Sequence, residues 1–477
     1  MPRNLAIALA ALLLLSGTLA ATDKDTDHWS RFRGPNGSGI AESGPLPTVF
    51  GPDENVVWKV EMPLGHSSPV LWGERLFLTG VEDEALLTIC LNRETGEELW
   101  RREAKRERVT KVDERNNAAS PSPAVDGDVV VVFFPDSGLV AYDLEGKELW
   151  RHPLGPFNNL YGMGASPIVV GSRVVLPCDQ QTGSFLIALD KQTGKVLWKQ
   201  DRPWARSGHC TPILTRTEDG KQQILLPGSF FLDAYDAETG ARVWWVGGLC
   251  FEMKSVPVMK DGILYINGFG SPFNQPGRQI TVKDFEEQDT NGDGQILPDE
   301  MPEGPLSGWF DFVDLAGDKK LDEGDWSYLR AALASQNGLL AIRVGGQGDC
   351  TEKNTLWAYR RGIPQLPSPL LIAETLYLVN DSGGLATTLD PESGEAKVRG
   401  RLKAQDNYYA SPVAADGKIY IASESGLVSV LSEGQGFEAL AVNELGEGCY
   451  ATPAIADGRL YIRTTGTLYC FGRTSGE

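Results

Sequence analysis

The sequence is short of positive charge, of long apolar runs and of familiar catalytic motifs. Its 477 residues contain 44 Lys and Arg against 64 Asp and Glu, a net charge of −20, and a negative field of that size repels phosphate backbones. We therefore expect no nucleic-acid partner. After residue 20 no stretch is apolar for long enough to span a membrane. No Gly-x-Ser-x-Gly elbow, His-Glu-x-x-His helix or phosphate-binding loop occurs, so none of these reaction classes is predicted.

Cysteine is also scarce, with seven residues in the chain. An odd number cannot pair completely, so at least one thiol is expected to be free. Cys90 and Cys470 stand where other repeats carry alanine, which predicts small buried positions. The other five lie in or beside predicted loops and could include one or two disulfides, which the sequence cannot assign: Cys178, Cys210, Cys250, Cys350 and Cys449.

Residues 1–20 are typical of a secretory signal. They begin with a basic residue, Arg3, continue with an apolar run from Leu5 to Leu15, and end with the small residues Thr18 and Ala20. We therefore expect an exported protein, located in the periplasm or outside the cell. No cysteine follows the apolar run, so no lipid anchor is expected. Residues 21–55 are assigned to an N-terminal extension.

Eight prolines recur through the chain, each just after a small residue and just before an apolar stretch. Most lie about 45 residues apart, a period typical of repeat proteins, in which one unit cannot bury its apolar face without a neighbour. One interval, from Pro257 to Pro369, is 112 residues long. The eight are Pro69, Pro123, Pro167, Pro212, Pro257, Pro369, Pro412 and Pro453.

Each repeat is predicted to be a four-stranded antiparallel meander. In residues 166–198 four β-rich runs are separated by Gly, Asp and Thr turns, which is the pattern of a β-propeller blade. In four repeats a Trp follows the last turn glycine by four residues: Gly96 and Trp100, Gly146 and Trp150, Gly194 and Trp198, Gly240 and Trp244. We interpret the indole as a wedge between blades that can still donate its N–H. A row of aromatics for ligand stacking is the alternative.

The two ends of the chain are predicted to share one blade. The last unit, 451–471, has only three strands, and Val56–Val60 supplies a plausible fourth. Joining them closes the ring and removes exposed sheet edges. The fold expected is an all-β, eight-bladed propeller formed by residues 56–270 and 337–477.

Two segments carry a resemblance to a known family. The stretch 188–198, Ala-Leu-Asp-Lys-Gln-Thr-Gly-Lys followed by Val-Leu-Trp, and the opening 29–37, Trp-Ser-Arg-Phe-Arg-Gly-Pro-Asn-Gly, resemble exported bacterial eight-bladed propellers with pyrrolo-quinoline quinone (PQQ)-type repeats. The resemblance covers about residues 29–477. It implies the fold, but it leaves activity open, because the family includes quinone dehydrogenases and non-enzymatic relatives similar to BamB.

The long interval indicates an insertion in blade five, between its second and third strands, at residues 271–336. Within it the stretch 289–300 matches the EF-hand pattern of oxygen ligands, with a glycine, Gly294, for the sharp turn at position six. An Asp- and Gly-rich surface turn is the alternative, and Pro298 is expected to shorten the exiting helix. The predicted Ca²⁺ ligands are Asp289, Asn291, Asp293, Gln295 and Glu300.

A second loop, 314–325, is a weaker match. It has Lys319 where glycine is expected and Ala316 at the third position. Because EF-hands usually occur in pairs, we expect it to complete the module, whether or not it binds Ca²⁺ tightly. Phe310, Phe312 and Trp326 are predicted to form the shared apolar core. Its acids are Asp314, Asp318, Asp322 and Asp325.

Polar and aromatic residues just before the recurring prolines are expected to gather at one mouth of the central channel, on the face that also carries the insertion. Such a funnel is a reasonable site for a small molecule or a peptide, although the same groups could simply hydrogen-bond loops and water. The predicted funnel residues are His66, Asn117, Tyr161, His209, Glu252, Lys254, Tyr409 and Tyr450.

We predict an exported, monomeric, non-catalytic binding or scaffold propeller of the cell envelope, with Ca²⁺ in its insertion and a protein or small-molecule ligand at its funnel. The alternative is a PQQ- and Ca²⁺-dependent alcohol or sugar dehydrogenase. Dehydrogenases of similar fold typically have an adjacent Cys-Cys pair, which this sequence lacks, and only Glu252 and Asn117 could join a metal-binding set. PQQ is therefore not expected, but the sequence does not exclude it.

Overall fold

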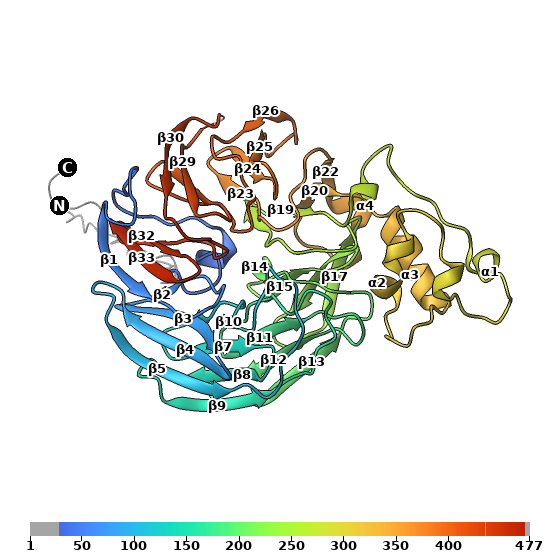
Figure 1. Cartoon of the computed structure of the whole chain (residues 1–477), viewed down its shortest axis with the longest axis horizontal. Coiled ribbons are helices and arrows are strands. Elements are labelled where there is room, and N and C mark those ends of the chain that lie inside the picture. Colours follow the sequence, from blue (N-terminus) through green and yellow to red (C-terminus); the bar gives the residue numbers. More distant parts are fainter. Residues whose placement is uncertain (1–27, 435, 473–477) are drawn as a thin grey trace, which may run out of the picture.

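The computed structural model describes residues 28–434 and 436–472, which form eight antiparallel sheets arranged in a ring (Figure 1). This confirms the predicted eight-bladed propeller. The predicted secretory signal, residues 1–20, lies outside the described residues. No helix in the described part of the chain is long and apolar enough to cross a membrane.

Blades one to four follow the chain in order. Blade one contains β2 (Val70–Trp72), β3 (Arg75–Glu82), β4 (Ala85–Asn92) and β5 (Glu98–Lys105). Blade two contains β6 (Ala124–Val125), β7 (Val130–Phe134), β8 (Gly138–Tyr142) and β9 (Glu148–Pro153). Blade three contains β10 (Ile168–Val170), β11 (Arg173–Cys178), β12 (Phe185–Asp190) and β13 (Val196–Asp201). Blade four contains β14 (Ile213–Arg216), β15 (Gln222–Pro227), β16 (Phe231–Asp236) and β17 (Arg242–Gly247), and β17 pairs with the short parallel strand β21 (Gly348–Asp349).

Blades five to eight complete the ring. Blade five contains β18 (Val258–Lys260), β19 (Ile263–Gly268), β20 (Gly338–Arg343) and β22 (Thr355–Tyr359), which follows the short helix α4 (Thr351–Asn354). Blade six contains β23 (Leu370–Ile372), β24 (Thr375–Val379), β25 (Leu385–Leu389) and β26 (Ala396–Arg401). Blade seven contains β27 (Val413–Ala415), β28 (Lys418–Ala422), β29 (Leu427–Ser432) and β30 (Ala439–Glu444). Blade eight contains β31 (Ala454–Ala456), β32 (Arg459–Arg463), β33 (Thr467–Gly472) and β1 (Val56–Glu61).

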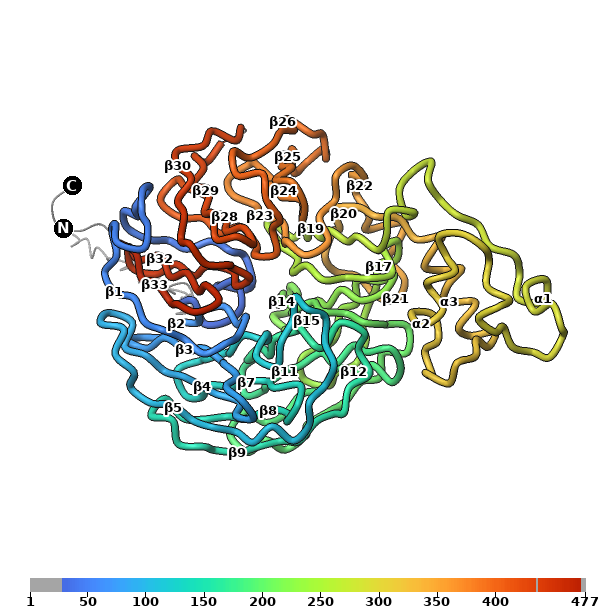
Figure 2. The backbone as a smooth tube through the Cα atoms, in the orientation of Figure 1, coloured from blue at the N-terminus to red at the C-terminus, as the bar shows by residue number. Residues whose placement is uncertain are grey.

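The ring is closed by the two ends of the chain. β1 pairs antiparallel with β33, so that Val60 lies opposite Leu468 and Trp58 lies opposite Cys470. Figure 2 shows β1, in blue, beside the red strands of blade eight. The prediction that residues 56–60 supply the fourth strand is confirmed, and the closure leaves no blade without a neighbour.

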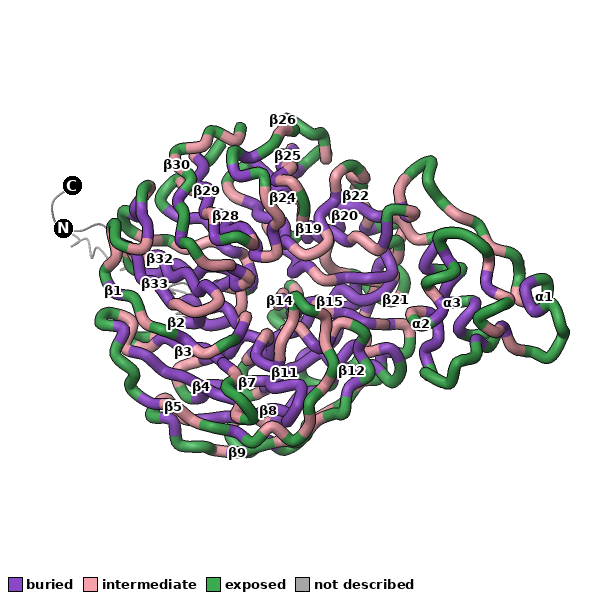
Figure 3. The backbone as a smooth tube through the Cα atoms, in the orientation of Figure 1, coloured by how far each residue is buried: buried purple, intermediate pink, exposed green. Residues whose placement is uncertain are grey.

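The inner strands of each blade are more deeply buried than the outer ones (Figure 3). All five residues of β7 are buried, whereas the outermost strand of the same blade, β9, has its only buried residue at Trp150. Continuous apolar runs are expected where both faces of a strand are covered by neighbouring sheets. The Val- and Leu-rich second and third strands therefore form the cores between blades.

The recurring tryptophans lie between adjacent blades, as predicted. The Nε1–H of Trp100 donates to the carbonyl of Leu144 in the next blade at 2.9 Å, and that of Trp150 donates to Lys191 at 2.8 Å. Trp198 and Trp357 make the same contact with Ala237 and Pro391. Each indole thus buries its ring and satisfies its polar atom at once.

Trp244, in blade four, departs from this pattern. It is fully buried, and its N–H donates within its own blade, to Oε1 of Gln223 at 3.1 Å. The next blade is the one interrupted by the insertion, and its third and fourth strands are joined through β21 and α4 instead of by a tight glycine turn. Trp58 in blade eight, which the repeat pattern did not reveal, takes the regular position and donates to Arg93 of blade one.

Part of the N-terminal extension crosses the ring. Residues 29–41, which include the short helix η2 (Pro35–Gly37), touch the innermost strands of several blades. The carbonyls of Trp29 and Ser30 accept the backbone N–H groups of Leu71 and Val125, in blades one and two. Asn36 exchanges two hydrogen bonds with Leu214 in blade four, and Gly39 accepts from Ala414 in blade seven. The segment therefore ties opposite sides of the ring together.

The insertion leaves the propeller after β19 and returns at β20. It contains η3 (Pro272–Asn274), α1 (Phe285–Gln288), η4 (Pro298–Glu300), η5 (Ser307–Trp309), α2 (Phe310–Val313) and α3 (Glu323–Ala334). It has its own apolar core, which includes Phe310 and Trp326, whereas Phe312 is only partly buried. The exiting helix after the first loop is a three-residue turn that starts at Pro298, as expected.

Aromatic contacts hold the insertion against blades four and five, beside the ring (Figure 1). Phe312 lies edge-on to Phe251, with ring centroids 5.6 Å apart, and Tyr328 lies edge-on to Phe230 at 6.0 Å. Of the three predicted core residues, Phe312 packs against the core from its edge and also contributes to docking. The insertion is attached through apolar surface on residues that show no periodic pattern in the sequence.

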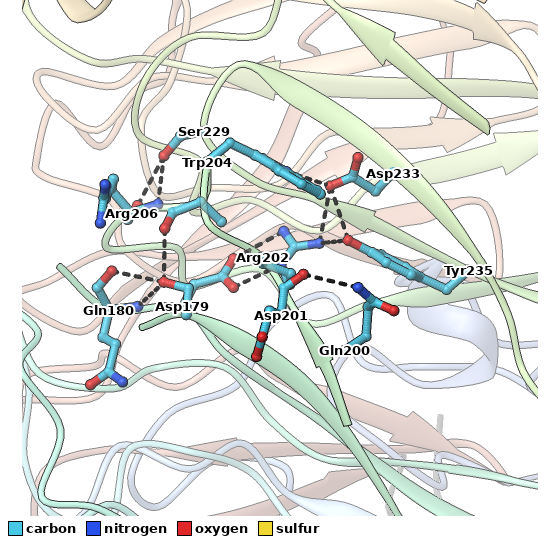
Figure 4. A network of polar contacts seen from close by, with 12 residues as sticks. Asp179, Gln180, Gln200, Asp201, Arg202, Trp204, Arg206, Ser229, Asp233 and Tyr235 are labelled. Carbon is cyan, nitrogen blue, oxygen red and sulfur yellow. Dashed lines mark hydrogen bonds and ion pairs between the residues drawn. The ribbon is translucent and has the colours of Figure 1, made fainter. Parts of the chain in front are cut away.

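Buried ion pairs support the same side of the propeller. Arg202 is fully buried between Asp179, at 2.8 and 3.1 Å, and Asp233, at 3.1 Å, and it also donates to the Tyr235 hydroxyl (Figure 4). The network joins the loop before β12 of blade three to β16 of blade four. All seven cysteines are buried and unpaired, so none of the disulfides considered from the sequence is present.

Candidate functional site

The predicted funnel exists as a cavity of about 200 Å³. Six of the eight residues nominated from the sequence line it, and they come from six different blades: His66, Tyr161, His209, Lys254, Tyr409 and Tyr450. Each precedes the innermost strand of its blade, where the chain enters the ring from one face. The sequence position just before the recurring proline therefore brings side chains 40 or more residues apart into one site.

One wall of the cavity is a stack of three rings. The ring of His66 is nearly parallel to that of Tyr450, with centroids 4.4 Å apart, and Tyr450 stacks in turn on Tyr409 at 5.7 Å. Stacked rings present an apolar body with polar edges. This wall can pack against a flat or apolar group of a ligand.

Lys254 and Tyr161 also line the cavity, and Lys254 belongs to a buried charge pair. Nζ of Lys254 lies 4.2 Å from the ring centroid of Tyr161 and 3.0 Å from Oε2 of Glu252. Burial, together with the negative charge of Glu252, raises the pKa of Tyr161, so its hydroxyl stays protonated. Glu252 is 2% exposed and lies outside the cavity lining.

The two funnel histidines are held in the neutral form. Burial, reinforced by the charge of Arg463, lowers the pKa of His66 to about 4, and burial with the charge of Lys254 lowers the pKa of His209 to about 3. Nδ1 of His66 lies 3.2 Å from the carbonyl of Arg115. Nε2 of His209 is buried with no hydrogen-bond partner in the described part of the chain. Neither ring carries a charge at neutral pH.

Two nominated residues do not line the cavity. Asn117 turns into its own loop, where Oδ1 accepts the N–H of Ala119 at 2.8 Å. Glu252 pairs with Lys254 and is separated from the cavity by it. Two lining residues that sequence reasoning missed are Asp113 and Arg115, which pair with each other. They belong to a long connection between blades that follows no repeat pattern, so the sequence offered no signal for them.

Hydroxyl groups recur at one position in seven of the eight blades, next to the cavity. In seven blades the residue before the recurring proline is Ser or Thr, and its oxygen accepts a backbone N–H from the preceding blade at 2.9–3.0 Å. We refer to these residues as the hydroxyl ring. In the sequence these positions stand out as a small residue before each proline. Their small size was recognised, but the role of their hydroxyl oxygen was not. The members are Ser68, Ser122, Ser166, Thr211, Ser368, Ser411 and Thr452.

The floor of the cavity is Phe32, from the segment that crosses the ring. Its neighbours Arg31 and Asn36 line a separate cavity with residues of blades two and four. The crossing segment therefore contributes to the lining of both cavities. A ligand in the funnel meets aromatic rings above, hydroxyl groups at the sides and Phe32 below.

The first loop of the insertion is folded around the carboxylate of Asp289. Its two oxygens accept the backbone N–H groups of Gly292, Asp293 and Gly294 at 2.7–3.2 Å. Gly294 has a φ of 80°, a conformation that glycine adopts without strain. At the other end of the loop Glu300 accepts the N–H groups of Thr290 and Leu297, at 2.9 and 3.1 Å.

The second loop repeats this conformation. Asp314 accepts N–H bonds from Gly317, Asp318 and Lys319 at 2.7–3.2 Å. Lys319 takes the left-handed conformation, with a φ of 67°, although its side chain makes that conformation costly. The loops are joined by two backbone hydrogen bonds between Ile296 and Leu321, at 2.9 and 3.0 Å.

The acids of these loops are not gathered into a preformed metal site. Within residues 28–434 and 436–472, no three His, Cys, Asp or Glu side chains are grouped closely enough to hold a metal ion. In the first loop the carboxylates of Asp289 and Glu300 are instead used by backbone N–H groups. The donor set, carboxylates with an amide and carbonyl oxygens, is the chemistry that Ca²⁺ prefers.

The insertion does not cover the funnel. None of the residues that line the cavity lies between 271 and 336. Its contacts with the propeller run through Phe251, Phe230 and Arg206, on the outer side of the funnel face. The insertion therefore docks beside the funnel and contributes no residue to its lining.

Comparison with known proteins assigns the chain to a family. The family described as "Outer membrane protein assembly factor BamB" matches residues 48–209 and 328–477, well over half of the sequence. The chain belongs to this family. The matched residues leave out blade four, the first half of blade five and most of the insertion.

Individual relatives are distant. A BamB of Francisella salina is 23% identical over 194 residues, which is 38% of this chain and 35% of that protein, so the match spans about a third of the relative. The crystal structure of BamB from Moraxella catarrhalis superposes with a TM-score of 0.54 and 13% identity, over 88% of this chain and 99% of that one. A europium-containing methanol dehydrogenase superposes with a TM-score of 0.58 and 10% identity, over 94% of this chain and 99% of that one. At such identities these structures show the fold alone.

Proposed function

We propose that the protein is an exported scaffold of the cell envelope that binds a partner at its funnel. Membership of the BamB family supports a binding propeller, and the relatives named as outer-membrane assembly factors support a place in the envelope. The signal-like residues 1–20 support export. The class of ligand is inferred from the site itself and not from the relatives, whose likeness is too distant to transfer a partner.

One observation carries the proposal. Six blades place polar and aromatic side chains on a single cavity, although those residues are scattered between positions 66 and 450. A propeller needs only apolar inner strands to fold, so the ring of Tyr, His and Lys side chains is not required by packing. A concave site with an apolar wall and a few convergent polar groups is the usual form of a binding site.

Site-specific photo-crosslinking tests this function in the native envelope. A benzophenone side chain placed at Tyr409, in the funnel, should form an adduct with another molecule, whereas the same group at Leu197, exposed on the outermost strand of blade three, should not. Both positions are accessible, so the comparison isolates the funnel. Adducts of equal yield at both positions, or none at Tyr409, would refute the proposal.

We further propose that the insertion binds Ca²⁺ through its first loop, with Asp289, Asn291, Asp293, Gln295 and Glu300 as ligands. The support is the paired loop conformation and the oxygen-only donor set. A carboxylate has about four acceptor sites, so the oxygens of Asp289 and Glu300 that accept backbone N–H groups can bind the ion as well. The second loop, with Lys319 at its turn, would serve mainly as the structural partner of the first.

A quinone-dependent dehydrogenase is the second candidate, favoured by the shared fold with the methanol dehydrogenase. The two residues that could help to hold a quinone-bound metal do not fit that role. The carboxylate of Glu252 is paired with the ammonium group of Lys254 at 3.0 Å, which places a cation where the metal would bind. Asn117 directs its oxygen into its own loop. We therefore derive no reaction for this candidate.

A further inference from the structure

The hydroxyl ring has a chemical consequence for the ligand of the funnel. Each of its seven oxygens accepts a hydrogen bond from a backbone N–H of the preceding blade, but within the described residues none of the seven hydroxyl groups donates one. A hydroxyl group carries one donor in addition to its acceptor sites. The O–H bonds of the ring are therefore available to a ligand.

Six of the seven residues of the hydroxyl ring line the cavity: Ser68, Ser122, Ser166, Ser368, Ser411 and Thr452. All six are at most 3% exposed. In the low dielectric of a protein cavity, a hydrogen bond from such a donor to a charged acceptor is stronger than in water. A ligand rich in acceptor atoms would satisfy several of them at once.

Two arginines behind the ring add positive charge. Arg33 is completely buried, and its Nη2 donates to the carbonyl of Pro369, the residue that follows Ser368, at 2.9 Å. Arg463 is 1% exposed and donates to Oγ of Ser67, next to Ser68, at 2.7 Å. Among the described residues neither guanidinium is paired with a carboxylate. Burial lowers the pKa of each to about 9, so both remain charged at neutral pH.

The carboxylates near the cavity are already engaged. Asp113 is paired with Arg115, and Glu252 is paired with Lys254. The two oxygens of Asp381 accept the backbone N–H groups of Gln365 and Leu366. Glu424 accepts from Asn407 at 2.8 Å and from the Tyr450 hydroxyl at 3.3 Å. None of them neutralises the two arginines behind the ring.

We propose that the hydroxyl ring at the base of the funnel binds a carboxylate group. A carboxylate offers about four acceptor sites to converging O–H donors, and its charge is favoured by Arg33 and Arg463 behind them. The carboxylate belongs either to a free organic acid or to a polypeptide. This inference rests on the proposed binding function and names the chemistry that the site recognises.

Blade five is the one blade that contributes no residue to the hydroxyl ring. Val256 stands at the position of the missing eighth hydroxyl, and Ser255 directs its own hydroxyl to the carbonyl of Asn267. Thr has nearly the shape of Val, so Val256→Thr adds one O–H donor without a large change in volume. One γ position of residue 256 faces Gly37, where little space remains, and the hydroxyl would occupy the other.

The test uses the full mature chain and two pairs of probes that differ only in the carboxylate. Benzoate is compared with benzamide, and the peptide acetyl-Gly-Gly-Phe is compared with its C-terminal amide, by isothermal titration. The aromatic ring of each probe can pack on the stack of His66, Tyr450 and Tyr409. We expect the acid of at least one pair to bind about tenfold or more tightly than its amide. A preference for benzoate alone indicates a small acid as the ligand, and one for the peptide alone indicates a chain terminus.

Variants then test whether the hydroxyl ring causes the preference for the acid over the amide. Ser411→Ala should reduce the ratio of acid to amide affinity about threefold or more, and Val256→Thr should increase it, whereas Ser172→Ala, in an exposed turn, should leave it unchanged. If Ser411→Ala does not fold, Val256→Thr still decides. An acid and amide of equal affinity in the wild type, or a ratio that neither ring variant changes, would overturn the inference. The crosslinking result does not depend on this ratio, so the two proposals fail separately.

Discussion

The indole of Trp150 lies flat against Gly194 in the next blade. A Cβ atom on Gly194 would stand 2.6 Å from Cδ2 of Trp150, closer than van der Waals contact allows, and the φ of this glycine is 68°. The same relationship joins Trp58 to Gly96, Trp100 to Gly146, Trp198 to Gly240 and Trp357 to Gly394. A turn glycine in one blade is therefore the docking surface for the tryptophan of the preceding blade.

Gly194→Ala should destabilise the propeller by more than backbone strain alone. The left-handed conformation costs an alanine about 1–2 kcal/mol, and the overlap with Trp150 adds about 1–3 kcal/mol. Gly171→Ala is the matched control, because Gly171 has a φ of 58° and a Cβ added there would have no atom within 4 Å. Urea unfolding of both variants measures the difference. Equal losses would contradict the docking role of Trp150.

Arg202→Met should cost about 3–5 kcal/mol, because it leaves Asp179 buried without its cation and removes one of the two arginines that pair with Asp233. Burial already raises the pKa of Asp179, and loss of the guanidinium would raise it further. The control is Arg151→Met, whose partner Glu148 lies 2.9 Å away on the exposed outer strand of blade two, where an ion pair contributes about 0–1 kcal/mol. Similar losses in the two variants would show that the buried network is not required.

Because the two funnel histidines are buried in the neutral form, the folded protein should lose stability as the pH falls. In the unfolded chain their pKa is about 6.5, whereas in the fold it is about 4 for His66 and about 3 for His209. As the pH falls below 6.5 the unfolded state binds protons that the folded state does not, so stability decreases. Between pH 7 and pH 5 we expect a loss of roughly 1–2 kcal/mol for each histidine.

The double variant His66→Gln/His209→Gln should lose correspondingly less stability over the same range, because glutamine does not titrate. Urea midpoints at pH 7 and pH 5 give the comparison, and few carboxylates titrate in this window. If wild type and variant lost the same stability, the histidines would not be buried in the neutral form.

Glu300→Gln should weaken Ca²⁺ binding to the insertion about tenfold or more, since the last position of such a loop supplies both oxygens of one carboxylate. It should also reduce the protection of residues 271–336 from protease in the presence of Ca²⁺. Glu303→Gln removes the same charge from an exposed residue outside the loop and should change neither property. Unchanged affinity and protease resistance in Glu300→Gln would refute the proposed ligand set.

The fold could be predicted from the sequence because its repeat is regular. Eight prolines and four tryptophans indicate the number of blades, the closure by residues 56–60 and the place of the insertion. Six of the eight nominated funnel residues line the cavity because the position before each proline has the same geometry in every blade. The predictions that Asn117 and Glu252 line the funnel are wrong because the direction of a side chain within a loop depends on local hydrogen bonds. The repeat does not determine these bonds.

Other features depend on contacts that only the closed ring creates. The hydroxyl of Ser122 meets the N–H of Ser68 across two blades, so its role cannot be deduced from either repeat alone. The crossing segment that places Phe32 at the floor resembles a family signature, but its sequence gives no indication of where it lies. The insertion docks through Phe312 and Tyr328, which have no periodic pattern.

Native mass spectrometry of the protein isolated from the envelope tests most directly whether it is a scaffold or a quinone-dependent dehydrogenase. We predict the mass of the polypeptide after removal of the signal, with Ca²⁺ and without a quinone, and no reduction of a dye by alcohols or sugars. An added mass the size of a quinone cofactor, together with dye reduction, would contradict the scaffold function and identify the protein as a dehydrogenase.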